Sequence, residues 1–305
     1  MLSIEDISNS AQIACVLEAT YPKPGNVNRF KEFQDTKFEH FLASAIGIGD
    51  ATREATLRGF RIRKEGLKYR NLNLGKLILQ AVRDSKKWHN GKNTNLGIAI
   101  LLIPLSASYG LALGGKGTSQ SNVRNELNKA IRNATTQDAI YFFRAVQLAN
   151  PGGLGEVDTL DVMDDNSIRE IIEEKLNLHN ILTFSNQNSI QQELTGKMHI
   201  TYDVGYPKIM EVYNKTGNLN LATLNGFMYI LASVPDSLIA QKKGAKVANK
   251  ISLMAKKIIE EGVSLEEIKK FDKKIRMKDN SLNPGTTADL TASSLMVCLL
   301  NGVRP

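Results

Sequence analysis

The stretch Asn93–Gly115, NTNLGIAILLIPLSASYGLALGG, decides the fold. It contains no charged residue, so it is long and apolar enough either to span a bilayer or to form a helix buried on all sides. Pro104 and several small polar residues interrupt it, and Lys92 and Lys116 flank it at both ends, so the charges specify no membrane orientation. No second run of this kind occurs. We therefore expect a buried core helix and no membrane span.

The rest of the chain shows the same helical periodicity. No alternating strand pattern, nucleotide-binding glycine loop, repeat or linker is found. We therefore expect one all-α domain over residues 1–305, with this helix at its centre and a ligand site where helix ends converge. Apolar residues recur at spacings of three and four in Ile4–Leu17, Phe38–Leu57, Leu74–Val82, Leu96–Leu111, Ala139–Leu148, Ile168–Leu176, Ile209–Tyr213, Leu221–Leu231, Val247–Ile259 and Leu290–Leu300.

The composition limits the class of partner. The 39 basic and 31 acidic residues give a net charge of +8, spread along the chain, and aromatic residues make up only 6%. Without a basic stripe or interleaved aromatics, the surplus favours a small anionic ligand over nucleic acid. Cys15 and Cys298 lie in apolar helical patterns and no signal peptide is evident, so we expect buried thiols and a cytoplasmic protein. A homodimer is an open alternative for its assembly.

The segment YPKPGNVNR, residues 21–29, joins two predicted helices. Pro22 ends the first helix, and Pro24 excludes helical geometry at Lys23 and holds this lysine extended. Gly25 allows the backbone to approach a ligand closely, and Asn26 follows it. The segment is either an anion contact or a rigid connector with a lysine facing solvent.

The core helix begins with two amides close together. Asn93 or Thr94 is a suitable cap for it, and one cap needs only one such side chain. The pattern is explained equally by capping and by a polar binding site deep in the molecule.

An acidic loop precedes the helix expected at Ile168. Carboxylates grouped on a loop bind divalent cations, and magnesium is the usual partner of nucleotide phosphates. The alternative is an acidic first turn of that helix, which suits Asp164 and Asp165 best, because the other acidic residues lie too early in the sequence. The loop contains Glu156, Asp158, Asp161, Asp164 and Asp165.

A second candidate anion site is NPGTTAD, residues 283–289. Gly285, Thr286 and Thr287 at a helix N-terminus form a plausible phosphate cradle. A capping box between Thr286 and Asp289 is the alternative. Asp236 follows a proline and is a candidate cap of the next helix or a functional carboxylate.

Together these segments resemble the triphosphoribosyl-dephospho-CoA synthase family. The segments YPKPGNVNR, NTNLG, GYP, PDSLIAQKKG and NPGTTADL come in the family's order and approximate spacing between Glu18 and Leu295. The resemblance implies an all-α, magnesium-dependent transferase. Such an enzyme moves the triphosphoribosyl group of ATP to the ribose 2′-hydroxyl of dephospho-CoA or a related acceptor, and it releases adenine.

The resemblance also implies roles for individual residues. Catalytic carboxylates are expected at Glu156, Asp203 and Asp236, and magnesium ligands at Glu156, Asp158 and Asp236. Contacts to the nucleotide and its phosphates are expected from Lys23, Gly25, Asn26, Asn93, Thr94, Lys242, Gly285, Thr286, Thr287 and Asp289.

The sequence departs from the family pattern at several positions. Asn95 and Leu96 replace a histidine and a lysine, Asn28 replaces an acid or histidine, and Leu154 stands where arginine is usual. The family's Gly-Gly-Ser becomes residues 285–287, Gly-Thr-Thr. The chain thus resembles a divergent member. A magnesium-dependent nucleotide or ADP-ribosyl hydrolase, and a nucleotide-binding protein without turnover, are the alternatives.

Overall fold

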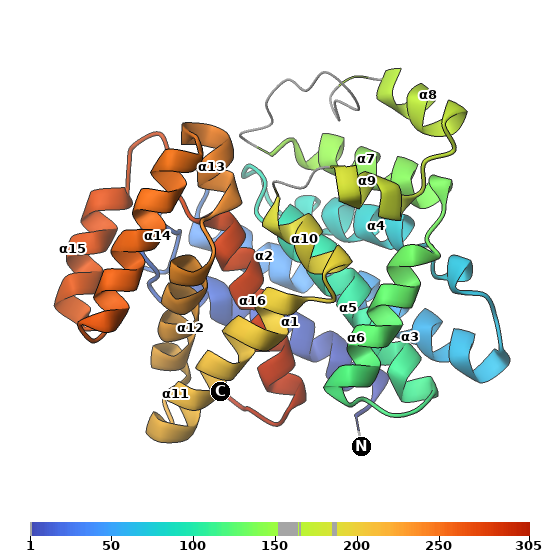
Figure 1. Ribbon diagram of the computed structural model, residues 1–305, viewed down its shortest axis with the longest axis horizontal. Helices are drawn as coiled ribbons and strands as arrows, with labels where there is room; N and C mark the ends of the chain where they lie inside the picture. Colours follow the sequence, from blue (N-terminus) through green and yellow to red (C-terminus); the bar gives the residue numbers. More distant parts are fainter. Residues whose placement is uncertain (1, 152–163, 165, 185–187) are drawn as a thin grey trace. The chain divides into compact units, whose positions relative to one another are not determined.

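The computed structural model describes residues 2–151, 164, 166–184 and 188–305 (Figure 1). These residues form α-helices joined by loops, and they contain no strand, only an isolated bridge between Asn28 and Lys31. The all-α expectation is confirmed.

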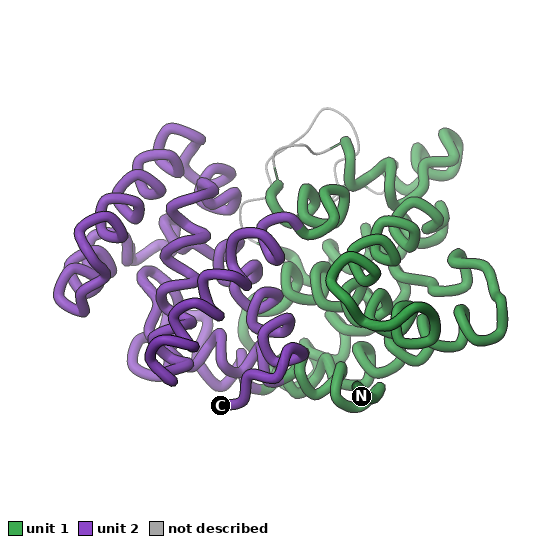
Figure 2. The backbone as a smooth tube through the Cα atoms, turned by 60° about the horizontal axis from the view of Figure 1, so that its bottom comes forward, with its two compact units in different colours: residues 1–12, 43–198 green, residues 13–42, 199–305 purple. Residues whose placement is uncertain are grey.

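The chain divides into two compact units, coloured separately in Figure 2. Unit 1 contains residues 1–12 and 43–198, and unit 2 contains residues 13–42 and 199–305. The helices α1 (Ile4–Thr20) and α2 (Phe38–Gly47) each contribute residues to both units. Neither unit is a continuous piece of sequence.

Unit 1 is built around α5 (Leu96–Gly114), which is buried along almost its whole length. It is the helix expected from the opening stretch, and 94% of its most apolar window is buried. It is also the only described helix long and apolar enough to cross a membrane, and its burial fits the expected core helix. The other elements of unit 1 are α3 (Gly49–Glu65), η1 (Tyr69–Leu72), α4 (Leu74–Lys86), α6 (Gln120–Arg132), α7 (Thr136–Ala149), α8 (Asn166–Glu173), α9 (Leu178–Phe184) and α10 (Ser189–Thr195).

The helices α3 and α5 pack with their backbones almost in contact. A Cβ atom on Gly59 would lie 2.1 Å from the carbonyl oxygen of Ala107, and one on Gly110 would lie 2.0 Å from that of Thr56. Because even one methyl group has no room at either position, the two glycines set the distance between these helices.

Unit 2 has its own hydrophobic core. Leu224 and Phe227 of α12, Ile251 of α14 and Phe271 of α15 are buried together in it. The helix α16 is apolar on all sides and almost fully buried. The elements that unit 2 contains entirely are η2 (Ile200–Gly205), α11 (Tyr206–Thr216), α12 (Leu219–Ser233), α13 (Ser237–Lys243), α14 (Ala245–Glu260), α15 (Leu265–Ile275) and α16 (Gly285–Leu300).

The structure differs from the expected helices in several places. The helix expected over residues 38–57 is two helices, α2 and α3, that meet at Ile48. A glycine lies on each side of Ile48 and allows close packing there: a Cβ on Gly47 would lie 2.8 Å from the Cα of Ser85, and one on Gly49 would lie 2.8 Å from the side chain of Gln12. The helices α6, α9 and α10 were not expected: α6 is mostly polar in sequence, and α9 and α10 are short, with 7 residues each.

Candidate active site

The buried lysine of the proline-bracketed segment lies in unit 2. The Lys23 side chain has no exposed surface, and its Nζ lies 3.0 Å from a carboxylate oxygen of Glu18. Nζ also donates to the main-chain carbonyl of Glu18 and to that of Tyr21, the latter at 3.3 Å. These three contacts use all three ammonium protons. Lys23 is therefore turned back onto the end of α1, so neither the anion contact nor the solvent-facing lysine expected from the sequence describes it.

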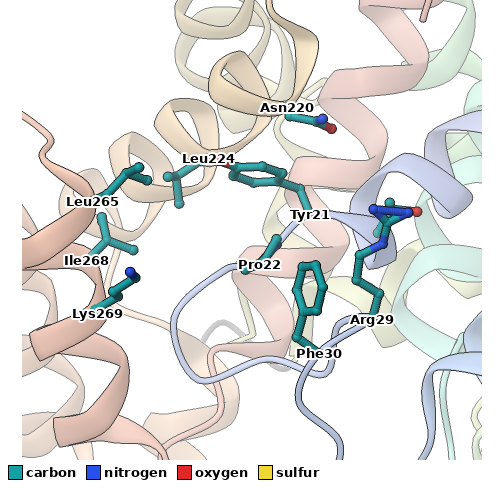
Figure 3. A pocket seen from close by; sticks show the side chains of 10 residues that line it. Tyr21, Pro22, Arg29, Phe30, Asn220, Leu224, Leu265, Ile268 and Lys269 are labelled. Atoms are coloured by element: carbon teal, nitrogen blue, oxygen red, sulfur yellow. The ribbon is translucent and has the colours of Figure 1, made fainter.

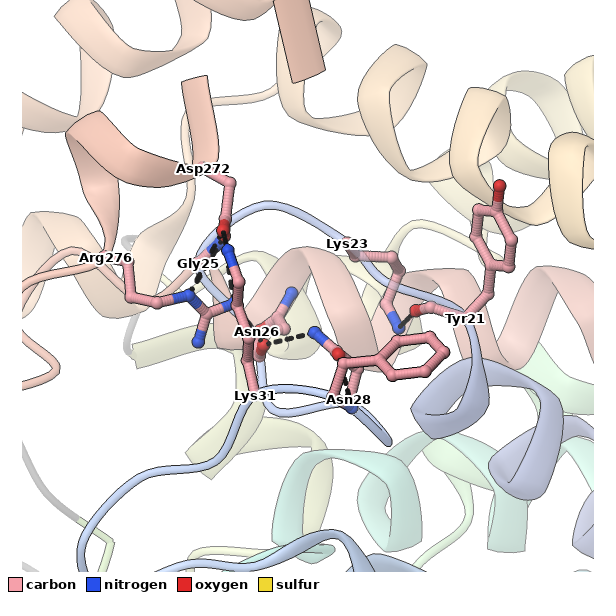
Figure 4. A network of polar contacts seen from close by, with 9 residues as sticks. Tyr21, Lys23, Gly25, Asn26, Asn28, Lys31, Asp272 and Arg276 are labelled. Atoms are coloured by element: carbon pink, nitrogen blue, oxygen red, sulfur yellow. Dashed lines mark hydrogen bonds and ion pairs between the residues drawn. The ribbon is translucent and has the colours of Figure 1, made fainter. Parts of the chain in front are cut away.

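The loop that carries this lysine is held by Asp272 of α15 (Figure 4). The main-chain N–H of Gly25 donates to Asp272 at 2.8 Å, and Arg276 and Lys31 donate to the same carboxylate. Burial opposes ionisation of Asp272, but hydrogen bonds from Arg276 and Lys31 hold its pKa below the usual value. Gly25 has a φ of +76°, and a Cβ there would lie 2.8 Å from Pro284 Cδ. Glycine is therefore required by backbone conformation and by close approach.

Two hydrogen-bond donors in this loop region have no partner among the described residues. Asn26 is buried and the Nδ2 of its side chain is unpaired, although its main-chain carbonyl oxygen accepts from Asn28 and Arg276. The Nη1 of Arg276 is also buried and unpaired. Buried donors without partners are costly, and a bound ligand, ion or water is one explanation for them. Asn26 was expected here from the sequence, whereas Arg276, directly after the lysine-rich α15, gave no signal.

Asp236 ties the start of α13 to the start of α16. Its Oδ1 accepts from the main-chain N–H groups of Leu238 and Ile239 at 3.0 and 3.1 Å. Its Oδ2 accepts from the N–H and the hydroxyl of Thr287 at 2.7 and 2.8 Å. Burial raises the pKa of Asp236, and the hydrogen bonds from Thr287 partly oppose that rise. With both oxygens engaged twice, this carboxylate acts as a cap.

The expected phosphate cradle of α16 already has protein partners. The N–H and hydroxyl of Thr287 are bound to Asp236, and the hydroxyl of Thr286 lies 3.0 Å from that of Ser237. Gly285 lies against Leu238. Lys242, at the end of α13, donates to the carbonyl of Asn280 at 3.4 Å. The structure therefore does not bring these groups together as an open anion site.

Asp289 differs from the other carboxylates of unit 2. It lies in the second turn of α16 and makes no hydrogen bond or ion pair with the described residues. Its pKa is raised well above the usual value, first by burial and then by the negative charges of Glu18 and Asp236. We call Glu18, Asp236 and Asp289 the carboxylate cluster. The capping box considered for Asp289 is not formed, because Thr286 pairs with Ser237 instead.

The NTN segment lies in unit 1. Asn93 Oδ1 accepts from the N–H of Leu96, the first residue of α5, at 3.0 Å, although Asn95 is the residue at the N-cap position. The Thr94 hydroxyl lies 2.6 Å from that of Ser44 and 3.3 Å from Nε2 of His89. Asn95 donates to the carbonyl of Ser44 at 3.2 Å. Thr94 and Asn95 thus bind the core helix to α2.

His89 is a residue that sequence reasoning missed. The resemblance described above predicts a histidine at the position where this chain has Asn95. Here His89 reaches Thr94 from five residues upstream, and its Nδ1 accepts from the N–H of Gly91 at 3.1 Å. Because Nδ1 is an acceptor, Nε2 carries the proton and donates to the Thr94 hydroxyl. An imidazole is therefore present beside the motif, supplied from another position.

The remaining expected carboxylates are not part of the carboxylate cluster. Asp203 lies on η2, and its Oδ2 is 2.8 Å from Nδ1 of His199 at an exposed position. Glu156 and Asp158 lie outside the described residues.

A magnesium site built by the protein is not evident among the described residues. No group of three or more histidine, cysteine, aspartate or glutamate side chains in that part of the chain is arranged to hold a metal ion. In the carboxylate cluster, Asp236 is saturated with hydrogen bonds and Glu18 is paired with Lys23, so Asp289 alone has both oxygens free of protein hydrogen bonds. One carboxylate does not fit a resident metal centre.

These geometries describe a helical protein with unpaired polar groups near helix ends, as expected of an enzyme that binds a polar small molecule. The chain belongs to the ATP:dephospho-CoA triphosphoribosyl transferase family (CitG), whose model matches residues 4–304. A proposed triphosphoribosyl-dephospho-CoA synthase from Archaeoglobus fulgidus has a similar crystal structure. It is 25% identical, with a TM-score of 0.63, and the match covers 86% of this chain and 100% of that chain. A comparison with curated protein sequences finds no match. The family resemblance and the transferase class are thereby confirmed.

Proposed function

We propose that this protein transfers the triphosphoribosyl group of ATP to the ribose 2′-hydroxyl of 3′-dephospho-CoA or a close relative. The family match over residues 4–304 supports ATP and dephospho-CoA as the substrates. In the proposed step, the acceptor oxygen forms a bond to C1′ of the ATP ribose and the bond from C1′ to the adenine nitrogen breaks. The hydroxyl proton goes to a general base, and adenine leaves after gaining a proton.

The observation that carries this proposal is the unpartnered Asp289. A general base needs a free lone pair and a pKa nearer to neutrality than that of an exposed aspartate. Asp289 makes no hydrogen bond with the described residues, and burial and the charges of Glu18 and Asp236 raise its pKa above that of an exposed aspartate, which makes its ionised form a stronger base. We therefore assign the proton acceptor to Asp289 instead of Glu156, Asp203 or Asp236.

The unpaired donors near the Lys23 loop, which is the connection of residues 21–37 between α1 and α2, have a separate role in the proposal. The Arg276 guanidinium is held by the carboxylate of Asp272 and by the main-chain carbonyl of Asn26, which orients its unpaired Nη1, and the unpaired Nδ2 of Asn26 is buried in the same region. Donors fixed in this way bind phosphate oxygens without a further ordering cost. We propose that they contact the phosphates of a nucleotide. The nucleotide contacts expected for Asn93 and Thr94 stay predictions.

Magnesium enters this proposal as part of the nucleotide substrate. Magnesium usually binds proteins through one or two carboxylates together with substrate phosphates, and this mode needs no cage of protein ligands. The metal-ligand roles expected for Glu156 and Asp158 stay predictions.

The direct test is adenine release. The protein is incubated with ATP, magnesium and dephospho-CoA, and free adenine and the coupled product are followed by chromatography and mass spectrometry. We expect adenine and product in equal amounts, and no adenine without acceptor.

The alternatives give other outcomes in the same experiment. Adenine or a ribosyl product formed without acceptor would indicate a hydrolase. Calorimetric binding of ATP with no product after long incubation would indicate a nucleotide-binding protein without turnover. Either result would contradict the proposed transfer.

A further inference from the structure

A pocket of about 350 Å³ opens in unit 2 beside the Lys23 loop (Figure 3). Its volume lies in the range of small-molecule sites. Tyr21, Pro22 and Phe30 form one side of it, and Leu265, Ile268 and Lys269 of α15 lie on the other. The remaining lining residues are Thr20, Arg29, Asn220 and Leu224.

The charge of this lining is positive and unbalanced. Arg29 and Lys269 line the pocket, and none of the lining residues is acidic. Neither cation forms an ion pair with a described residue, whereas Lys270 of the same helix pairs with Glu266. The guanidinium of Arg29 lies 5.6 Å from the centre of the Phe30 ring. A pocket with two cations and no carboxylate favours an anionic ligand.

Apolar side chains are also exposed at the pocket, and their exposure to water is unfavourable in the free protein. The Phe30 side chain is 73% exposed and that of Leu265 is 61% exposed. Tyr21 presents a second ring from the end of the same loop (Figure 3). Aromatic rings bind planar bases by stacking, with little dependence on which base it is.

We propose that this pocket is a nucleotide subsite. An aromatic base packs against Phe30 and Tyr21, and the attached phosphate lies near Arg29 and Lys269. The inference deepens the proposed function, which requires two adenine nucleotides, and it rests on that function only for the identity of the ligand. ATP and dephospho-CoA share the required chemistry, and the experiment separates them.

The experiment measures equilibrium binding of ATP, dephospho-CoA and inorganic triphosphate by calorimetry, for the full chain and for variants. Phe30→Ala should weaken binding of a base-containing ligand about tenfold or more and leave triphosphate binding unchanged. Lys269→Gln should weaken binding and reduce its dependence on salt concentration. Phe30→Tyr keeps a ring and should bind as the wild type does.

Matched controls exist outside the pocket. Phe184→Ala removes another exposed phenylalanine, at 66% exposure, and Lys273→Gln removes an exposed lysine one turn further along α15. Neither change should affect nucleotide binding. Circular dichroism and the melting temperature verify that the variants fold.

The outcomes assign the source of the ligand. An effect of Phe30→Ala on ATP alone makes the pocket a donor subsite, and an effect on dephospho-CoA alone makes it an acceptor subsite. If Phe30→Ala and Lys269→Gln bind both nucleotides like the wild type, the inference is wrong even when adenine is released. If Phe30-dependent binding is found but no adenine is released, the subsite stands and the proposed function fails.

Discussion

Asp289 is costly to the folded protein as a buried carboxylate, and it is useful to the proposed reaction as a base. It is an aspartate set beside two other carboxylates of the carboxylate cluster, and its pKa is raised by burial and by these charges. Such an arrangement stabilises the protonated form, and it makes the ionised form a stronger base.

Asp289→Asn should lower the rate of adenine release by about 10²–10⁴-fold, because the amide cannot accept the hydroxyl proton. The assay is steady-state product formation at saturating substrates. Asp279→Asn is the control, because Asp279 is an exposed aspartate of unit 2 paired with Lys243. A wild-type rate in Asp289→Asn would remove this residue from the mechanism.

The pH dependence of activity and of stability should have opposite signs at Asp289. Activity requires the ionised form, so kcat/KM should rise with pH through a pKa above the usual aspartate range. The folded state holds this proton more tightly than the unfolded state, so the free energy of unfolding should fall over the same interval. Both changes should disappear in Asp289→Asn. They are measured by pH–rate profiles and by urea unfolding at several pH values.

The buried pair of Glu18 and Lys23 permits a second test at this scale. Lys23→Met leaves Glu18 buried without a counter-charge, so the free energy of unfolding should fall by about 3–5 kcal/mol. The double variant Glu18→Gln with Lys23→Met should recover much of this loss. Lys270→Met, in an exposed ion pair with Glu266, should change little. Equal losses in the single and double variants would contradict the explanation.

The sequence located the Lys23 loop but not the direction of its lysine. Pro22 and Pro24 fix the backbone of this segment, so its extended path was predictable. The partner of the lysine was not, because Glu18 lies in the preceding helix and has the appearance of an ordinary helical glutamate. Asp272 and Arg276 escaped notice for a similar reason, since they meet Gly25 and Asn26 only after the chain has folded.

Among the elements, periodicity predicted the long apolar helices and failed at short or polar ones. The core helix α5 and the helix α16 follow directly from their apolar composition. The cap at Ser264 also marks the start of α15, because its side chain accepts from the N–H of Glu267 at 3.2 Å. The helix α6 has few apolar positions, and packing against the rest of unit 1 stabilises it as a helix.

The contact between α3 and α5 predicts that replacing a helix glycine by alanine destabilises the protein. Alanine in place of glycine normally stabilises a helix interior by about 1 kcal/mol. Gly59→Ala should instead destabilise unit 1 by about 1–3 kcal/mol, because its Cβ would meet the carbonyl of Ala107. Thermal and urea unfolding measure the change. Ser121→Ala, at an exposed position of α6, should be nearly neutral. A stabilised Gly59→Ala would show that the helices are free to separate.

For the whole molecule, the single domain expected from the sequence stays a prediction, and the described residues form two compact units within it. The division was not predictable from linkers, because no linker separates the units. Two helices, α1 and α2, pass from one unit to the other within their own length. A helix gains its stability cooperatively along its length, so the two units share part of their stability.

The two units should unfold in one transition, and each carries its own natural probe. The single tryptophan, Trp88, is in unit 1, and both cysteines, Cys15 and Cys298, are buried in unit 2. Tryptophan fluorescence and the reactivity of the thiols should therefore change at the same urea concentration. Far-UV circular dichroism gives a third measure. Two separated midpoints would contradict the coupling.

Each unit is built from two separate segments of the sequence, and this arrangement restricts how the gene can recombine. Residues 13–42 and 199–305 build one unit together, and Gly25 and Pro284 touch across that gap in the chain. A single crossover between two homologous genes, wherever it falls within the coding sequence, leaves at least one unit with parts from two parents. We therefore expect divergence in this lineage to proceed through compensating substitutions, and the two distant segments of unit 2 to be inherited together.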